Sequence, residues 1–210
     1  MSGANKHKFI LEHIDVPSKT PELFSLLPCK KAVLVLTLIF TFQNDNVYAD
    51  NNKELEINIK AAYLYNFLHF VDWPKNINQP ESNICVYGVE KRHRTAFNSM
   101  ASLGKKDSKI SIKLFEADAG PRGLSSCQII FITDNAKHKS NAILDYLKHN
   151  QSLTVGESDG FINRGGMINF ILVQGKVRFE INHDVVKAAG LKISSKVLRI
   201  AEKVISDEDV

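Results

Sequence analysis

Two cysteines are the residues of this chain with the most definite chemistry. Cys85 and Cys127 each open an apolar run, CVYG and CQIIFI. A disulfide needs Cα atoms about 4.4–6.8 Å apart, a distance that neighbouring strands can provide. In an oxidising compartment an even pair favours one disulfide, and a reduced, buried pair is the alternative. We therefore expect a Cys85–Cys127 disulfide if the protein is exported.

The other candidates for catalysis or metal binding form no recognisable site. The histidines after residue 50 show neither HxH nor HExxH spacing; they are His69, His93, His138, His149 and His183. Gly165-Gly166 lacks the lysine and the following helix of a phosphate loop, and fits a turn before a strand. Glu157 and Asp159 fit a bend around Asp-Gly better than an acid/base pair. The sequence thus predicts no catalytic residue, metal ligand or cofactor, and we expect that the protein is not an enzyme.

Two arginines and two aromatic residues are the candidate binding residues. Arg164 lies in the polar segment FINRGG and Arg178 on the polar side of a later strand, and the two can lie near one another. Paired guanidinium groups suit an anionic ligand or an acidic partner, with ordinary solvation as the alternative. Tyr65 and Trp73 belong to AAYLYNFLHFVDWP, residues 61–74, whose other aromatic side chains face a core. Tyr65 and Trp73 remain for a partner, with core packing as the alternative for Trp73.

The composition is that of a soluble globular domain. Apolar residues make up 44% of the 210 residues and charged residues 24%, with a formal net charge of +4. No run of five basic residues occurs, so the sequence gives no electrostatic reason to expect nucleic-acid binding.

The first 49 residues have the features of a secretory signal peptide. Lys30-Lys31 precede an uncharged run at 32–42, and Val47-Tyr48-Ala49 has the spacing of a signal-peptidase site. Eleven helical residues span only about 16 Å, against about 30 Å for a membrane core. We expect residues 1–49 to be removed and 50–210 to form the mature domain. An uncleaved membrane anchor is the alternative.

Strand and helix patterns alternate through most of the mature chain. Helices are predicted over 53–72, 92–104 and 135–149, with Asn135 as a cap, and strands over 83–88, 110–116, 127–133 and 153–157. The continuous branched run CQIIFIT is typical of a central strand that is covered on both faces. This alternation predicts an α/β fold, a single three-layer domain with a mixed sheet flanked by helices.

The last third of the chain predicts a β-hairpin followed by helices. Residues 167–182 form two apolar strands around a Gln174-Gly175 turn, and we expect this hairpin at the edge of the sheet. A short helix and a break at Gly190 follow. Apolar residues at helical spacing from Val197 to Val204 then predict a final amphipathic helix.

Several motifs, taken together, resemble the YfiR family of periplasmic proteins. They are IKAAYLYNFLHFVDWP, ICVYG, CQIIFI, LTVGESDGFINRGGMINFILVQGKVRFEIN and AGLKISSKVLRIA, in that order after a signal peptide. The resemblance covers nearly all of 55–205. It implies a disulfide between the matching cysteines, Cys85 and Cys127. Some members carry a second cysteine pair before the hairpin; GESDGFINRGG has none, which puts redox control through that pair in doubt.

The resemblance implies a regulatory role in the periplasm. Proteins of this family bind the periplasmic sensor domain of an inner-membrane diguanylate cyclase and repress it, which lowers cyclic di-GMP and biofilm formation. An outer-membrane lipoprotein sequesters the repressor, and family members tend to form homodimers. Tyr65, Trp73, Arg164 and Arg178 are then candidate partner-binding residues. A periplasmic small-molecule-binding module is the alternative, and an enzyme is a more distant one.

Overall fold

The computed structural model describes the backbone of residues 45–74, 81–103 and 109–206. Most of the predicted signal peptide lies outside these ranges. The first described helix, α2 (Asp45–Phe70), runs through the expected cleavage site after Ala49. Within the described ranges, no helix is both long enough and apolar enough to cross a membrane.

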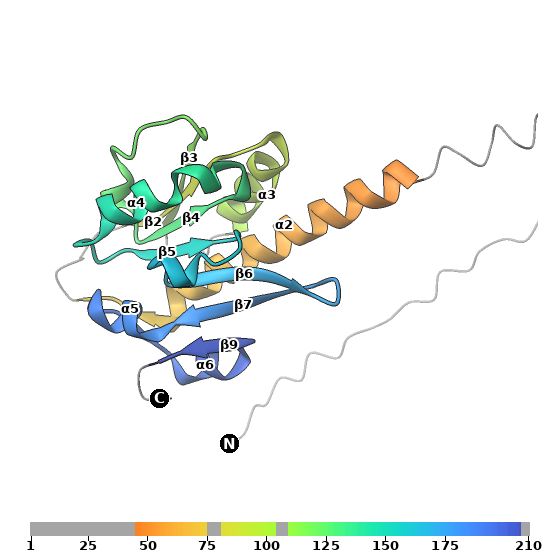
Figure 1. Ribbon diagram of the computed structural model, residues 1–210. Helices are drawn as coiled ribbons and strands as arrows, with labels where there is room; N and C mark the ends of the chain where they lie inside the picture. Colours follow the sequence, from red (N-terminus) through yellow and green to blue (C-terminus); the bar gives the residue numbers. More distant parts are fainter. Residues whose placement is uncertain (1–44, 75–80, 104–108, 207–210) are drawn as a thin grey trace, which may run out of the picture. The chain divides into compact units, whose positions relative to one another are not determined.

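A seven-stranded mixed sheet forms the centre of the domain (Figure 1). The strands, in their spatial order, are β3 (Lys109–Phe115), β2 (Glu81–Tyr87), β4 (Ile129–Ile132), β5 (Leu153–Gly156), β6 (Ile168–Val173), β7 (Lys176–Asn182) and β9 (Lys203–Ile205). Neighbours are parallel from β3 to β6, β6 and β7 are antiparallel, and β7 and β9 are parallel again. The predicted α/β fold with a mixed sheet is therefore confirmed.

Helices cover both faces of the sheet, which gives the three layers that the sequence predicts. In β2, Ile84 and Val86 pack with α2 and α3 (Lys91–Leu103), whereas Cys85 and Tyr87 pack with residues of the opposite layer. That second layer contains η2 (Leu124–Ser126), η3 (Asp134–Lys139) and α4 (Ser140–Leu147). Successive side chains of a strand point to opposite faces, so buried apolar residues at every position indicate a strand covered on both sides.

The aromatic stretch of α2 supplies the centre of the larger core. Tyr63 lies 5.3 Å from Phe179 and 6.0 Å from Phe170, measured between ring centroids. The ring centroid of Phe67 lies 5.5 Å from that of Phe179 and 6.3 Å from that of Phe170. Edge-to-face and offset pairs at these distances stabilise beyond the area they bury. Most of this aromatic surface therefore joins the first helix to the hairpin strands β6 and β7.

The predicted helix 53–72 ends two residues early. The helix stops at Phe70, and β1 (Val71–Asp72) pairs antiparallel with β8 (Lys192–Ile193). The backbone N–H of Ser194 also donates to the carbonyl of Phe70 at 2.9 Å. Pro74 disfavours helical backbone at the residue before it, and the distant partner strand supplies hydrogen bonds that replace those of another helical turn.

The predicted final helix is wrong in its second half. After α5 (His183–Ala188), the chain forms α6 (Ser195–Ile200), becomes extended at Ala201 and continues as β9. The N–H of Glu202 donates to the carbonyl of Phe179 at 2.9 Å, because β7 offers an unpaired edge. The predicted hairpin is present, with both turn residues at positive φ (Gln174 50°, Gly175 73°). However, β9 covers part of its outer edge, so β7 is not the last strand.

The predicted helix 135–149 is divided into two parts. It consists of the 3-10 segment η3 and of α4, with a kink at Ala136. Thr133 precedes η3, and no side-chain cap bond forms there. Asn135, the predicted cap, instead donates through Nδ2 to the carbonyl of Gly88 at 3.4 Å. The contact to a neighbouring strand end takes the place of local capping.

Candidate functional site

A charged cleft lies at the carboxyl ends of the parallel strands. It has a volume of about 330 Å3 and is lined by Lys53, Glu56, Ile57, Lys60, Glu90, Arg92, His93, Asp134, Asn135 and Glu157. These residues follow β2, β4 and β5 or belong to α2. From β2 the chain crosses to β3 on one side, and β4 and β5 lie on the other. In open α/β sheets, ligands bind outside the carboxyl ends of strands where the order reverses in this way.

Gly88 brings the ends of β2 and β4 close together beside the cleft. Its φ is +87°, and a Cβ there would lie 2.5 Å from Oγ1 of Thr133 and 2.6 Å from the Cβ of Ala136. Its carbonyl accepts a hydrogen bond from Oγ1 of Thr133 at 2.6 Å. Glycine is required at this position for both its backbone conformation and its lack of a side chain.

Lys60 links α2 to the sheet through a buried ion network. The residue is 7% exposed, and its Nζ donates to Oε2 of Glu157 at 2.6 Å and to Glu56. The other oxygen of Glu157 accepts from the backbone N–H of Asp134 at 2.8 Å. Burial alone lowers the pKa of Lys60, but the charges and hydrogen bonds of Glu157 and Glu56 outweigh it and raise the pKa above 10.5. Lys60 is therefore charged and bridges the carboxylates of Glu56 on α2 and Glu157 after β5.

His93 is the second buried titratable group of the cleft. It is 6% exposed, and its Nδ1 accepts from the backbone N–H of Glu90 at 3.0 Å. Burial lowers its pKa below 6.5, against the raising effect of Glu157 and Glu90. At neutral pH the imidazole is therefore uncharged, with its proton on Nε2.

Arg164 lies at an adjoining cleft of about 570 Å3, which shares Asp134 and Glu157 with the first. It belongs to η4 (Ile162–Arg164). Its guanidinium donates to the carbonyl of Asp159 at 2.6 Å and to Oγ of Ser158 at 3.1 Å. The side chain is exposed but held against its own loop.

The structure does not bring Arg164 and Arg178 together. Arg178 is exposed on β7 and pairs in register with Ile171. The contact between β7 and the η4 turn is made by Asn182, whose Nδ2 donates to the carbonyl of Ile162 at 3.0 Å. Four residues of strand, about 13 Å, separate Arg178 from Asn182. The two side chains thus have different surroundings, Arg164 on its own loop and Arg178 on the exposed face of β7.

Tyr65 and Trp73 are half-buried beside the larger core. The ring of Tyr65 meets that of His69 edge-on at 5.0 Å. Nε1 of Trp73 donates to the carbonyl of Leu68 at 3.2 Å, and both aromatic residues pack against the buried cluster. Each therefore has a structural role, and each retains some exposed surface for a partner.

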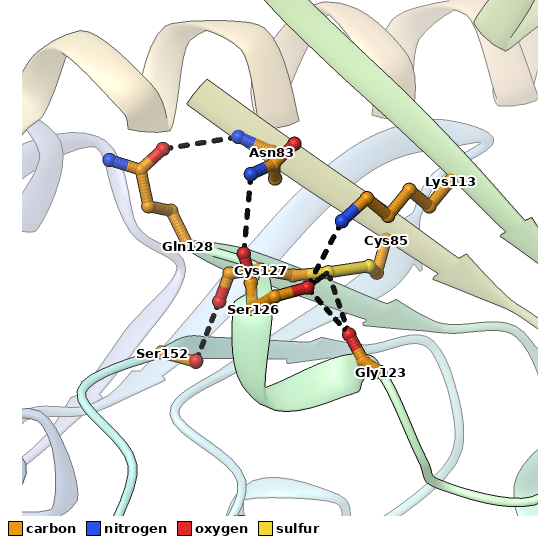
Figure 2. The surroundings of a disulfide bond; sticks show 8 residues. All are labelled: Asn83, Cys85, Lys113, Gly123, Ser126, Cys127, Gln128 and Ser152. Atoms are coloured by element: carbon orange, nitrogen blue, oxygen red, sulfur yellow. Dashed lines mark hydrogen bonds between the residues drawn. A yellow bond between two sulfur atoms is a disulfide. The ribbon is translucent and has the colours of Figure 1, made fainter. Parts of the chain in front are cut away.

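A disulfide joins Cys85 and Cys127, so the bonded form is the one present (Figure 2). The Cα atoms are 5.9 Å apart, within the range for such a bridge. Around it, Nδ2 of Asn83 donates to the carbonyl of Ser126 at 3.3 Å, and Oγ of Ser152 donates to that of Cys127 at 2.6 Å. The bridge is buried and fastens β2 to the segment that leads into β4.

Comparison with known proteins decides the family. Residues 57–202 match the family described as YfiR/HmsC-like. The chain belongs to the YfiR/HmsC-like family. No curated protein matches the sequence.

Solved structures resemble this YfiR/HmsC-like protein in fold alone. A conserved domain protein from Vibrio cholerae O1 biovar El Tor is similar over 71% of this chain and 60% of its own, with a TM-score of 0.52 and 12% identity. An ABC domain from Streptococcus pneumonia, solved in complex with L-Trp, has a TM-score of 0.47 and 12% identity over 60% of this chain and 55% of its own. This chain thus spans little more than half the length of either.

Sequence reasoning missed the network around Lys60, Glu157 and His93. Lys60 and Glu157 are 97 residues apart, and only the fold brings them together. One local signal was present: EKRHR follows the strand ICVYG after a single residue, Val89, so the end of a strand is followed by a helix that begins with cationic residues. In the described residues, no group of three or more His, Cys, Asp or Glu is placed to hold a metal ion.

Proposed function

We propose that this protein acts in the periplasm, after removal of residues 1–49, as a repressor of an inner-membrane diguanylate cyclase. It binds the periplasmic sensor domain of the cyclase and holds the cytoplasmic catalytic output down. Cyclic di-GMP and biofilm formation fall as a result. The observation that carries this proposal is the YfiR/HmsC-like match, which spans 57–202 and so includes every strand of the seven-stranded sheet except β9.

The structure is consistent with a protein that acts by binding partners through its surface. Cys85 and Cys127 are bridged and buried, which removes them as nucleophiles. Large apolar side chains are exposed on α2, where Leu55 is 58% and Phe70 39% exposed. Exposed apolar and aromatic residues are the usual anchors of protein interfaces. We place the partner surface on α2 and on the polar face of β7, with Tyr65, Trp73 and Arg178 as contacts.

The proposal also includes a role for Arg164, a homodimer and an outer-membrane lipoprotein partner. Arg164 is fixed to Ser158 and Asp159 and offers its charge to an acidic partner at the second cleft. We further propose that the mature protein forms a homodimer and that an outer-membrane lipoprotein sequesters it. Both follow from the family role.

Deletion of the gene tests the proposal. We expect cellular cyclic di-GMP to rise, and the wild-type gene to restore the low level. Arg178→Glu should restore little, because it reverses an exposed charge without disturbing the core. Arg122→Glu is the matched control, since it makes the same charge change at another exposed arginine. Unchanged cyclic di-GMP in the deletion strain, with the cyclase expressed, would contradict repression.

A further inference from the structure

The solvent-facing side of α2 carries no charged residue over more than four turns. Between Leu55 and Phe70, no exposed position of the helix is Asp, Glu, Lys or Arg. The exposed residues of this stretch form the outer face of α2; they are Leu55, Asn58, Ile59, Ala62, Asn66, His69 and Phe70. A helix at the surface of a domain usually turns its charged residues away from the core. Here the two charged residues of the stretch, Glu56 and Lys60, form the ion network with Glu157 on the sheet side instead.

The residues of the outer face recur at the spacing of a helix–helix contact. Ile59 follows Leu55 by four residues and Ala62 follows Ile59 by three, and Asn66 comes four residues later. Alternating intervals of four and three place side chains in one row along a helix, as at the a and d positions of a coiled coil. A single Asn in such a row restricts which helices pair and in what register. The outer face thus has the pattern of a helix that packs against another helix.

The row is open to solvent in the structure. Leu55 is 58% exposed, Ile59 36% and Phe70 39%. The buried residues of α2, among them Leu64 and Phe67, belong to the larger core on the other side of the helix. Figure 1 shows α2 lying along the sheet, with its amino-terminal part extending beyond it. Aligned apolar side chains on such a helix gain free energy when another surface covers them.

A second copy of the chain matches the outer face in charge. A partner that brought charged side chains to the row would bury them opposite uncharged residues, which is costly. A second copy brings the same uncharged row, so no charge is buried without a counter-charge. Asn58 and Asn66 carry both donors and acceptors and can pair across the contact with asparagines of the other copy. A contact between two identical surfaces closes around a two-fold axis, which limits the assembly to a dimer.

We propose that the outer face of α2 is the interface of a homodimer, in which the α2 helices of two copies pack against each other. This inference rests on the homodimer in the proposed function and gives it a location in the fold. Tyr65, Trp73 and Arg178, the proposed contacts with the cyclase, are not among the residues of the outer face.

The test is analytical ultracentrifugation of the purified protein over a wide range of concentrations. We expect the wild type to sediment as a dimer that dissociates on dilution. Leu55→Glu places a charge in the row, so it should weaken dimerisation at least about tenfold. Ile200→Glu is the matched control, because Ile200 is 57% exposed on α6 and receives the same change. The control should dimerise within about twofold of the wild type.

A second variant should move the equilibrium in the opposite direction. A polar Asn in an apolar row lowers the stability of the helix pair in exchange for specificity. Asn66→Leu should therefore tighten the dimer several-fold or add a larger assembly. Circular dichroism of all three variants checks that each is folded, which we expect because the three positions are exposed.

The possible outcomes separate this inference from the proposed repression. A wild type that is monomeric at every concentration would overturn the interface and the homodimer, while repression is judged by cyclic di-GMP in the deletion strain. A dimer that survives Leu55→Glu, or that Ile200→Glu weakens equally, would overturn the α2 interface alone. Loss of binding to the cyclase sensor domain by a monomeric Leu55→Glu, with the wild type also monomeric, would assign the outer face to the cyclase and overturn the proposal.

Discussion

The two ends of β4 are held to their neighbours in opposite ways. At its entry, the Cys85–Cys127 disulfide and hydrogen bonds from Asn83 and Ser152 fasten the chain. At its exit, Lys60 and Glu157 form a buried ion network beside an open cleft. A covalent bond and neutral hydrogen bonds do not depend on the ionisation of side chains, whereas an ion network does. The stability of the entry is therefore independent of these charges, and the stability of the exit depends on them.

The largest effect should come from breaking the covalent end. Replacing both Cys85 and Cys127 with Ala removes a link across a sequence separation of 42 residues. In the loop-entropy model the free energy of unfolding falls by about 4 kcal/mol. Urea unfolding of the oxidised wild type and of the double variant measures the difference. A reducing agent should destabilise the wild type and leave the variant unchanged. If the double variant loses less than about 1 kcal/mol in the free energy of unfolding, the disulfide is not what stabilises the entry of β4.

A somewhat smaller effect should follow from removing the cation at the exit. Lys60→Met keeps the length of the side chain but leaves Glu56 and Glu157 without their partner. Breaking a buried pair on one side costs about 3 kcal/mol in the free energy of unfolding, again measured in urea. Lys53→Met, an exposed lysine on the same helix, should change stability by no more than about 0.5 kcal/mol. Equal effects of the two substitutions would show that the network does not support the exit.

The smallest effect should be a pH dependence confined to the exit. The pKa of His93 is lowered in the folded protein, so the unfolded chain binds the proton more readily. Stability should therefore fall as the pH drops below about 6.5, the unfolded value. Thermal melting at pH 7 and pH 5 measures this loss. His93→Gln should reduce the difference between the two pH values, and an unchanged difference would assign the loss to other groups.

Local sequence patterns were sufficient to predict the strands and the turn whose structure does not depend on distant partners. The runs ICVY and IIFI were predicted as strands because their apolar residues fill both faces, and this is how Ile84, Cys85 and Ile130 are buried. The Gln174-Gly175 turn was predictable because turn chemistry is local. The three-layer fold follows from the order of these segments.

Endings and long-range contacts were not predictable from local patterns. β1 and β9 have two and three residues and exist because β8 and β7 offer them hydrogen bonds. The same apolar spacing that suggested a continuing helix after Ile200 also suits a strand against β7. In the site, no local sequence feature distinguishes Lys60 from the other lysines, because its partner Glu157 is 97 residues away in the sequence.

The pairing of β1 with β8 has a consequence for how the chain matures. Phe67 packs against Phe170 and Phe179, and Val71–Asp72 pair with Lys192–Ile193, all a hundred or more residues downstream. A polypeptide that emerges amino end first, from a ribosome or through a translocation channel, therefore carries these aromatic residues without their partners from β6 and β7 until almost all of it has appeared. Until then, the same rings that complete the finished core are the segment most in need of a chaperone.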